Sequence, residues 1–305
     1  KTENNALRDD VIDLPRPDWL TELQRHGGSV LAEDKDINQW EARNMQKVCV
    51  AGSSDCEAVE AAMSVFYGMV NGTSLEVGFL DGVTDSETLL LASQQGFRRI
   101  GIEADLRRRE KRQQLCPDAL AVTAALCSSS KNIHYMLSSA TQNQGVIEFM
   151  NPGNQFWPFT RAYQEWVKVG KDWDQMNWTS HPHFLLPCVR LEQVLTHVRI
   201  NVIDFMILDV QGVEMNVLQS INFSAVRINV LSIEGNGNEK KILEYMTGGA
   251  TNYLYTPIWP WLVGRNLWFQ RKDFQRRAKL GLDAEPWLTT KPVYKCRRGS
   301  QSVAC

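Results

Sequence analysis

Short apolar runs alternate with amphipathic stretches through the middle of this 305-residue chain. The first three runs, residues 74–80, 99–105 and 119–126, have the length and composition of strands. Residues 86–95 have the apolar spacing of an amphipathic helix, and a basic helix is expected to end near Gln114. Because strands that alternate with helices form parallel sheets, this pattern predicts an α/β fold.

The second half repeats the pattern after an irregular stretch. Residues 202–210 and 227–234 are nearly continuous apolar runs, as expected for strands buried on both faces of a sheet. Residues 132–149 are expected to add one or two strands. Helices are expected at 213–220 and 239–246, and a closing hairpin is expected at 252–255 with 266–270.

This alternation divides the chain into three parts. Residues 1–72 read as a helical preface, because the stretch from Glu57 to Tyr67 has apolar positions at helical spacing. Residues 73–270 form the core, with an aromatic-rich insertion at 151–185. Residues 271–305 form a basic C-terminal extension.

Composition narrows the class of protein. The chain has 33 Lys and Arg against 35 Asp and Glu, so its formal net charge of −2 argues against a nucleic-acid partner held by bulk electrostatic attraction. It has no uninterrupted apolar run of about 18 residues or more, so no membrane span is expected within it. An N-terminal anchor removed from the chain is compatible with this sequence.

Seven cysteines show neither a CxxC pair nor a cluster with histidines at zinc spacing, which favours disulfides over a structural metal site. Two close pairs, Cys49 with Cys56 and Cys296 with Cys305, are the candidates that spacing suggests. Disulfides indicate an oxidising compartment, namely the lumen of the secretory pathway (Golgi) or the outside of the cell. The cytoplasm is the alternative location.

Three N-glycosylation sequons, at Asn71, Asn177 and Asn222, point to the same compartment and to a glycoprotein. Asn222 directly follows a predicted helix close to the core, so it is the sequon least expected to carry a glycan.

Acids and glycines stand where predicted strands end, which is where parallel sheets bind ligands. Glu76, Gly78 and Asp81 end the first strand, and Glu103 ends the second, where a carboxylate can accept the hydroxyl hydrogens of a ribose. Neither a GxGxxG turn nor a phosphate-binding P-loop sequence occurs. An acid two residues before Gly78 instead suits a ligand with a cationic amino group, such as S-adenosylmethionine (SAM).

Five ordered blocks resemble the FkbM-type methyltransferases, over roughly residues 73–270. The blocks are Glu76-Val-Gly-Phe-Leu-Asp-Gly, Gly101-Ile-Glu-Ala-Asp, Ala124-Ala-Leu-Cys, Pro187-Cys-Val-Arg-Leu and Ile203-Asp-Phe-Met-Ile-Leu-Asp-Val-Gln-Gly-Val-Glu. The resemblance implies a class I, Rossmann-like fold, with a mostly parallel seven-stranded sheet and helices on both faces. It also implies SAM-dependent transfer to hydroxyl oxygens, often of sugars or glycosylated compounds.

The resemblance also assigns residues to the cofactor. Glu76, Gly78 and Asp81 are expected at the methionine end of SAM, with Ser86 assisting. Glu103 is expected at the ribose, and Ala104 and Ala125 in the adenosine pocket.

Acidic residues are expected on the acceptor side. Asp209 and Glu214 match a signature of the family, and Glu234 ends the next strand. These three acids are candidate ligands for Mg²⁺ or Ca²⁺, both of which prefer oxygen donors. Gln211 stands where the family usually has a glutamate, which leaves activity open. The base that deprotonates the acceptor is then Asp209, Glu234 or His183.

The sequence therefore predicts a SAM-dependent O-methyltransferase that acts on a hydroxyl of a glycan or small molecule, with possible help from a divalent cation. The aromatic insertion is expected either to stack on the acceptor or to form a small satellite core. The alternative function is that of a catalytically inactive FkbM-like domain, which serves as an interaction or trafficking module in the secretory pathway.

Overall fold

The computed structural model describes most of the predicted core and little of its flanks. The described residues are 65–66, 69–83, 86–117, 119–128, 131–137, 145–149, 160–177, 179, 181, 183–258, 265–274, 295–298 and 301–304. The predicted helix at 57–67 therefore lies largely outside the described residues, and so does most of the basic extension.

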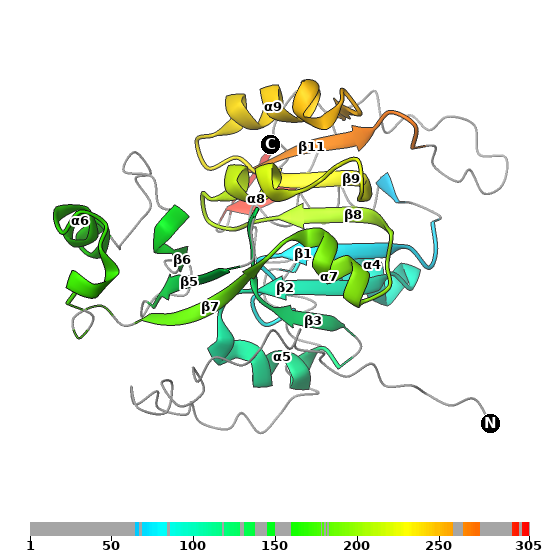
Figure 1. Ribbon diagram of the computed structural model, residues 1–305. Coiled ribbons are helices and arrows are strands. Elements are labelled where there is room, and N and C mark those ends of the chain that lie inside the picture. The colour runs from blue at the N-terminus through cyan, green and yellow to red at the C-terminus, as the bar shows by residue number, and fades with distance from the viewer. Residues whose placement is uncertain are drawn as a thin grey trace, which may run out of the picture.

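A seven-stranded sheet forms the centre of the molecule, in the order β10-β11-β9-β8-β1-β2-β3 (Figure 1). Strands β3, β2, β1, β8 and β9 run parallel, β11 runs antiparallel to β9, and β10 pairs antiparallel with β11. The bounds are β1 Thr73–Val77, β2 Arg98–Glu103, β3 Leu120–Thr123, β8 Val202–Leu208, β9 Arg227–Glu234, β10 Tyr255–Pro257 and β11 Asn266–Arg271.

The strand order reverses direction between β1 and β8. From β1 the chain moves outward to β2 and β3, and it then returns to place β8 on the other side of β1. In open α/β sheets, ligands bind beyond the carboxyl ends of strands at such a switch point. The ends of β1 and β8 are therefore the first place to look for a site.

Helices cover both faces of this sheet, as the alternation of side chains along β8 requires. Met206 and Leu208 join a buried cluster with Val217 of α8, whereas Phe205 and Ile207 join another with Leu91 of α4. The helices are α4 Leu89–Gln95, α5 Arg109–Leu115, α6 Thr160–Lys168, α7 Leu191–His197, α8 Glu214–Ser220 and α9 Glu239–Thr247, with 3₁₀ turns at Leu106–Arg108, Ile147–Phe149, Trp173–Gln175 and Gly249–Thr251. The predicted α/β architecture is confirmed.

A second sheet was not predicted. It has four strands in the order β4-β7-β5-β6 and extends beyond the carboxyl edge of the main sheet (Figure 1). Its strands are β4 Ala125–Leu126, β5 Lys131–Met136, β6 Gly145–Val146 and β7 His183–Val189.

The strand expected at 119–126 is divided between the two sheets. Leu120–Thr123 pairs with β2, whereas Ala125–Leu126 pairs with β7. Leu120, Val122, Ala124 and Leu126 are all buried, so the apolar pattern continues across the point where the chain changes partners. A hydrophobic pattern alone therefore cannot reveal this change.

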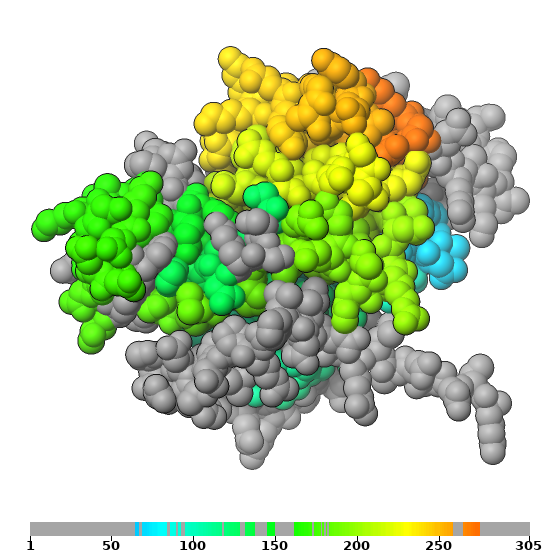
Figure 2. All heavy atoms as spheres, viewed as in Figure 1, coloured from blue at the N-terminus to red at the C-terminus, as the bar shows by residue number. Residues whose placement is uncertain are grey.

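The insertion shares a small buried core with the second sheet, and Figure 2 shows its residues, in green, as a projection at one side of the molecule. Met136, Ile147 and Trp166 pack there with Val213, which follows β8. This shared core thus includes a residue of the loop at the carboxyl end of β8.

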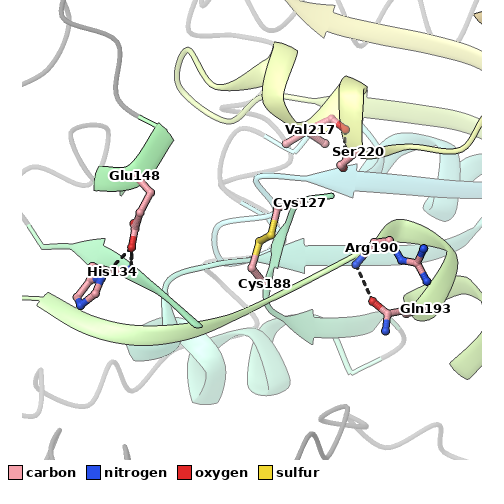
Figure 3. Close-up of a disulfide and its surroundings, with 8 residues drawn as sticks. All are labelled: Cys127, His134, Glu148, Cys188, Arg190, Gln193, Val217 and Ser220. Atoms are coloured by element: carbon pink, nitrogen blue, oxygen red, sulfur yellow. Dashed lines mark hydrogen bonds and ion pairs between the residues drawn. A yellow bond between two sulfur atoms is a disulfide. The ribbon is translucent and has the colours of Figure 1, made fainter. Parts of the chain in front are cut away.

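A disulfide joins Cys127 to Cys188, whose Cα atoms are 5.8 Å apart (Figure 3). It was not predicted, because the two residues are 61 positions apart and only the pairing of β4 with β7 brings them together. Of the pairs that were predicted, Cys49, Cys56 and Cys305 lie outside the described residues, and Cys296 lies in β12 (Lys295–Arg298), which pairs with β13 (Gln301–Ala304).

Among the described residues, every helix is too short or too polar to cross a membrane.

Candidate functional site

The loop after β1 touches the end of β8 directly. Gly78 has φ of +97°, and a Cβ atom at this position would lie 1.9 Å from the carbonyl oxygen of Asp209. The backbone N–H of Asp209 donates to the carbonyl of Val77 at 3.0 Å. Only glycine fits here, because a side chain would need both an unfavourable φ and space that the backbone of β8 fills.

Glu76 lies in a buried polar network beneath this loop. Its Oε2 accepts hydrogen bonds from Ser86 Oγ at 2.8 Å and Thr88 Oγ1 at 2.6 Å. Arg99 of β2 donates to the same two hydroxyl groups, and its guanidinium lies 4.0 Å from the Glu76 carboxylate. Burial raises the pKa of Glu76, and the charge of Arg99 opposes this shift. Glu76 and Ser86 thereby fix the loop that follows β1.

Glu103 joins the ends of β1 and β2. Its two oxygens accept from the backbone N–H groups of Leu80 at 2.7 Å and Asp105 at 2.6 Å. Arg112 of α5 donates to the carbonyls of the same two residues, each at 3.2 Å. Burial raises the pKa of Glu103, and the charge of Arg112 opposes this shift. Both carboxylate oxygens retain a second lone pair for a ligand.

Asp81 organises the loop rather than pointing away from it. Only 1% of the residue is exposed, and its carboxylate accepts from the backbone N–H of Val83 at 3.1 Å and pairs with Lys111 Nζ at 3.0 Å. Ala104 and Ala125, which are far apart in sequence, pack against one buried cluster that includes Tyr135.

Asp209, Glu214 and Glu234, hereafter the acidic cluster, come together at the carboxyl ends of β8 and β9. One oxygen of each lies within 4.8 Å of the others, an arrangement that can hold a metal ion. Glu214 and Glu234 are buried, whereas Asp209 is partly exposed. Three carboxylates this close repel one another unless a proton or a cation is present.

Glu214 is the most enclosed member of the acidic cluster. Its Oε1 accepts from Gly212 N at 2.8 Å, Val210 N at 3.3 Å and Asn236 Nδ2 at 3.0 Å. Its Oε2 is buried and has no hydrogen-bond partner among the described residues. Burial raises its pKa to about 7, although the backbone donor at Gly212 opposes the shift.

Two amide side chains complete the cluster. Asn236 donates to both Glu214 and Glu234, and Gln211 donates from Nε2 to Asp209 Oδ1 at 2.9 Å. Asn236 was missed by sequence reasoning, and the available signal was its position in the Gly-Asn-Gly turn after β9. Gln211 was noticed only as a departure from the family pattern.

Among the described residues, His183 is not a member of the acidic cluster. It is on β7 of the second sheet, where its Nδ1 is 3.1 Å from the carbonyl oxygen of His181. Its ring centre is 5.6 Å from that of His134, whose Nδ1 lies 2.8 Å from Glu148 (Figure 3). The described residues therefore include a separate pair of histidines that sequence reasoning did not group.

The comparison with known families agrees with this geometry. The methyltransferase FkbM domain matches residues 76–262, which is more than half of the chain. No curated protein matches the chain. The matched range begins at Glu76 and includes every member of the acidic cluster. The chain therefore belongs to the FkbM methyltransferase family.

Proposed function

We propose that this protein transfers the methyl group of SAM to a hydroxyl oxygen of a glycan or small-molecule acceptor. The family supplies the reaction class, and the acidic cluster beyond β8 and β9 is the observation that carries the proposal. We also propose that the main sheet is a Rossmann-like, class I core, because its strand order changes direction at β1 and β8.

SAM supplies a methyl group on a positively charged sulfur. Gly78 lets the loop after β1 pack closely against the backbone of Asp209, and Glu103 presents carboxylate lone pairs that suit ribose hydroxyls. Glu76 and Asp81 act through the loop, since both are buried against its own polar groups. Ala104 and Ala125 offer small apolar surfaces to an adenine ring.

The residues present fit a divalent cation. The buried Oε2 of Glu214, which has no partner among the described residues, is the kind of atom that a cation would satisfy. Asp209 and Glu234 would complete an oxygen-rich set suited to Mg²⁺ or Ca²⁺. A bound cation would lower the pKa of an acceptor hydroxyl, and Asp209, the partly exposed member, would take its proton.

The insertion supplies one wall of the proposed acceptor site. The buried cluster that it shares with the second sheet includes Val213, directly before Glu214, so its position is tied to that of the acidic cluster. Trp166 is only 7% exposed and belongs to this satellite core, so it supports the wall rather than stacking on a sugar. For an acceptor that reaches the second sheet, His183 would be a candidate base.

One observation favours the alternative of an inactive FkbM-like module. Gln211 replaces a glutamate that is usual in the family, and its amide donates to Asp209. An acceptor proton would then have to compete with this bond for the same carboxylate.

We further propose that the protein resides in the lumen of the secretory pathway (Golgi) or is secreted. The Cys127–Cys188 disulfide supports this location, because such bonds are rare in reducing compartments.

Calorimetric titration with SAM and with S-adenosylhomocysteine tests the proposed function. Binding of both ligands is expected, and a folded protein that binds neither would overturn the enzyme proposal in favour of the module. Transfer of tritium from methyl-labelled SAM to a glycan array, with and without a chelator, then tests the acceptor class and the cation. Loss of transfer on chelation, restored by Mg²⁺ or Ca²⁺, is the expected result.

A further inference from the structure

The sequon at Asn222 stands on a fixed, exposed turn between α8 and β9. Phe223 is only 4% exposed and packs edge-on against Tyr255, with ring centres 5.6 Å apart. Its neighbours Asn222 and Ser224 are both exposed. The buried ring therefore anchors the turn and directs the residues on either side of it towards solvent.

The side chain of Asn222 has the geometry of an Asx turn. Its Oδ1 accepts from the backbone N–H of Ser224 at 3.1 Å. The backbone carbonyl of Asn222 accepts from the backbone N–H groups of Ala225 and Val226. The side-chain amide oxygen of Asn222 is thus hydrogen-bonded to the backbone of Ser224, which belongs to the same sequon. Because the glycan is attached to the nitrogen, the amide hydrogen bond of the turn does not have to break for a glycan to be present.

The position of this turn leaves the proposed active site open. Asn222 precedes β9, whereas Glu234 of the acidic cluster ends the same strand. At about 3.3 Å per residue, the two ends of β9 are roughly 23 Å apart. Asn71 precedes β1 and therefore stands at the same amino edge of the main sheet.

We propose that Asn222 carries an N-linked glycan, contrary to the expectation from sequence. A glycan is bulky and requires an exposed site in the folded protein, which this turn provides. The proposal rests on the lumenal location proposed above. It does not depend on the methyltransferase reaction.

The test is to express the full chain behind a cleavable secretion signal in insect or mammalian cells. The secreted protein is treated with an amidase that removes N-glycans in ¹⁸O water, which marks each formerly glycosylated asparagine as labelled aspartate. Labelled Asp at position 222 is the expected result, and an unlabelled Asn222 in secreted protein would overturn the proposal. Because the added signal sends the chain to the lumen, an unlabelled Asn222 could not be explained by a wrong proposal for the protein's native location.

Substitutions provide matched controls. Asn222→Gln and Ser224→Ala should each remove one glycan step on a gel, whereas Ser224→Thr should retain it. The affinity of Asn222→Gln for SAM should equal that of the wild type, because the turn lies at the opposite edge of the sheet. If a variant is not secreted, the peptide map of the wild type still decides the question.

Discussion

At the level of single residues, two uncharged side-chain amides hold the acidic cluster together. Asn236 spans Glu214 and Glu234, and Gln211 contacts Asp209, so each carboxylate has a donor that brings no positive charge. Hydrogen bonds from these two amides therefore offset part of the repulsion among the carboxylates.

Glu214 should make the stability of the cation-free protein depend on pH. Its pKa in the folded state is about 7, above the ordinary value of 4.5, so its contribution is fully present below pH 4.5 and is lost as pH rises through 7. Glu214→Gln should remove this loss, which amounts to about 3 kcal/mol at most. Urea unfolding in EDTA at a series of pH values measures it. If the free energy of unfolding changed equally with pH in the wild type and in Glu214→Gln, the raised pKa would not belong to Glu214.

Glu103 should determine affinity for SAM. Glu103→Gln keeps an oxygen for one backbone donor but loses the charge and one acceptor, so SAM affinity should fall by about 10- to 100-fold. Glu110→Gln, at an exposed position on α5, serves as the control and should bind normally. Calorimetry provides the measurement, and unchanged affinity in folded Glu103→Gln would show that the ribose lies elsewhere.

Gly78 tests the close approach of β1 and β8. Gly78→Ala combines a φ of +97° with a contact at 1.9 Å from a backbone oxygen, and we expect destabilisation of more than about 2 kcal/mol. Gly170→Ala is a matched control, since φ is +70° there but nothing lies within 4 Å of the added Cβ. That variant should lose only about 1 kcal/mol. Equal losses in urea unfolding would mean that φ alone matters.

At the level of elements, the sequence predicted the main sheet well and the second sheet poorly. Strands such as Val202–Leu208 are nearly continuous apolar runs that are mostly buried, and Asn266–Arg271 forms the expected closing hairpin with Tyr255–Pro257. In contrast, β4 is only two residues long, so its pairing with β7 leaves no periodic signal. At the candidate site, the sequence was sufficient to nominate the acids at strand ends, which the structure brings together, whereas Asn236 could be recognised only from the geometry of its turn.

The disulfide constrains the second sheet covalently. Replacing both Cys127 and Cys188 by Ala should lower the free energy of unfolding by about 2 to 5 kcal/mol, because the bond closes a long loop in the unfolded chain. Denaturation of the double variant, and of wild type with and without a reductant, measures this loss. A reductant should have no further effect on the double variant if this bond is responsible.

At the level of the whole molecule, ligands should report on the proposed site through stability. A ligand that binds only the folded state at 100 times its Kd stabilises the protein by about 2.7 kcal/mol. SAM and Mg²⁺ or Ca²⁺ should each raise the melting temperature of the wild type, whereas Asp209→Asn should lose the response to the cation and keep the response to SAM. Thermal scans decide this, and a cation response that survives in Asp209→Asn would remove Asp209 from the ligand set.

The disulfide also determines what a cut in the insertion does to the molecule. Cys127 and Cys188 lie where the chain enters and leaves the second sheet, so the residues between them form a covalent ring. A protease that cleaves once within this ring breaks the peptide chain but leaves its two halves joined. The cleaved protein would migrate as one species on a non-reducing denaturing gel and as two fragments after reduction. In the folded protein before reduction, the main sheet would still contain strands from both halves.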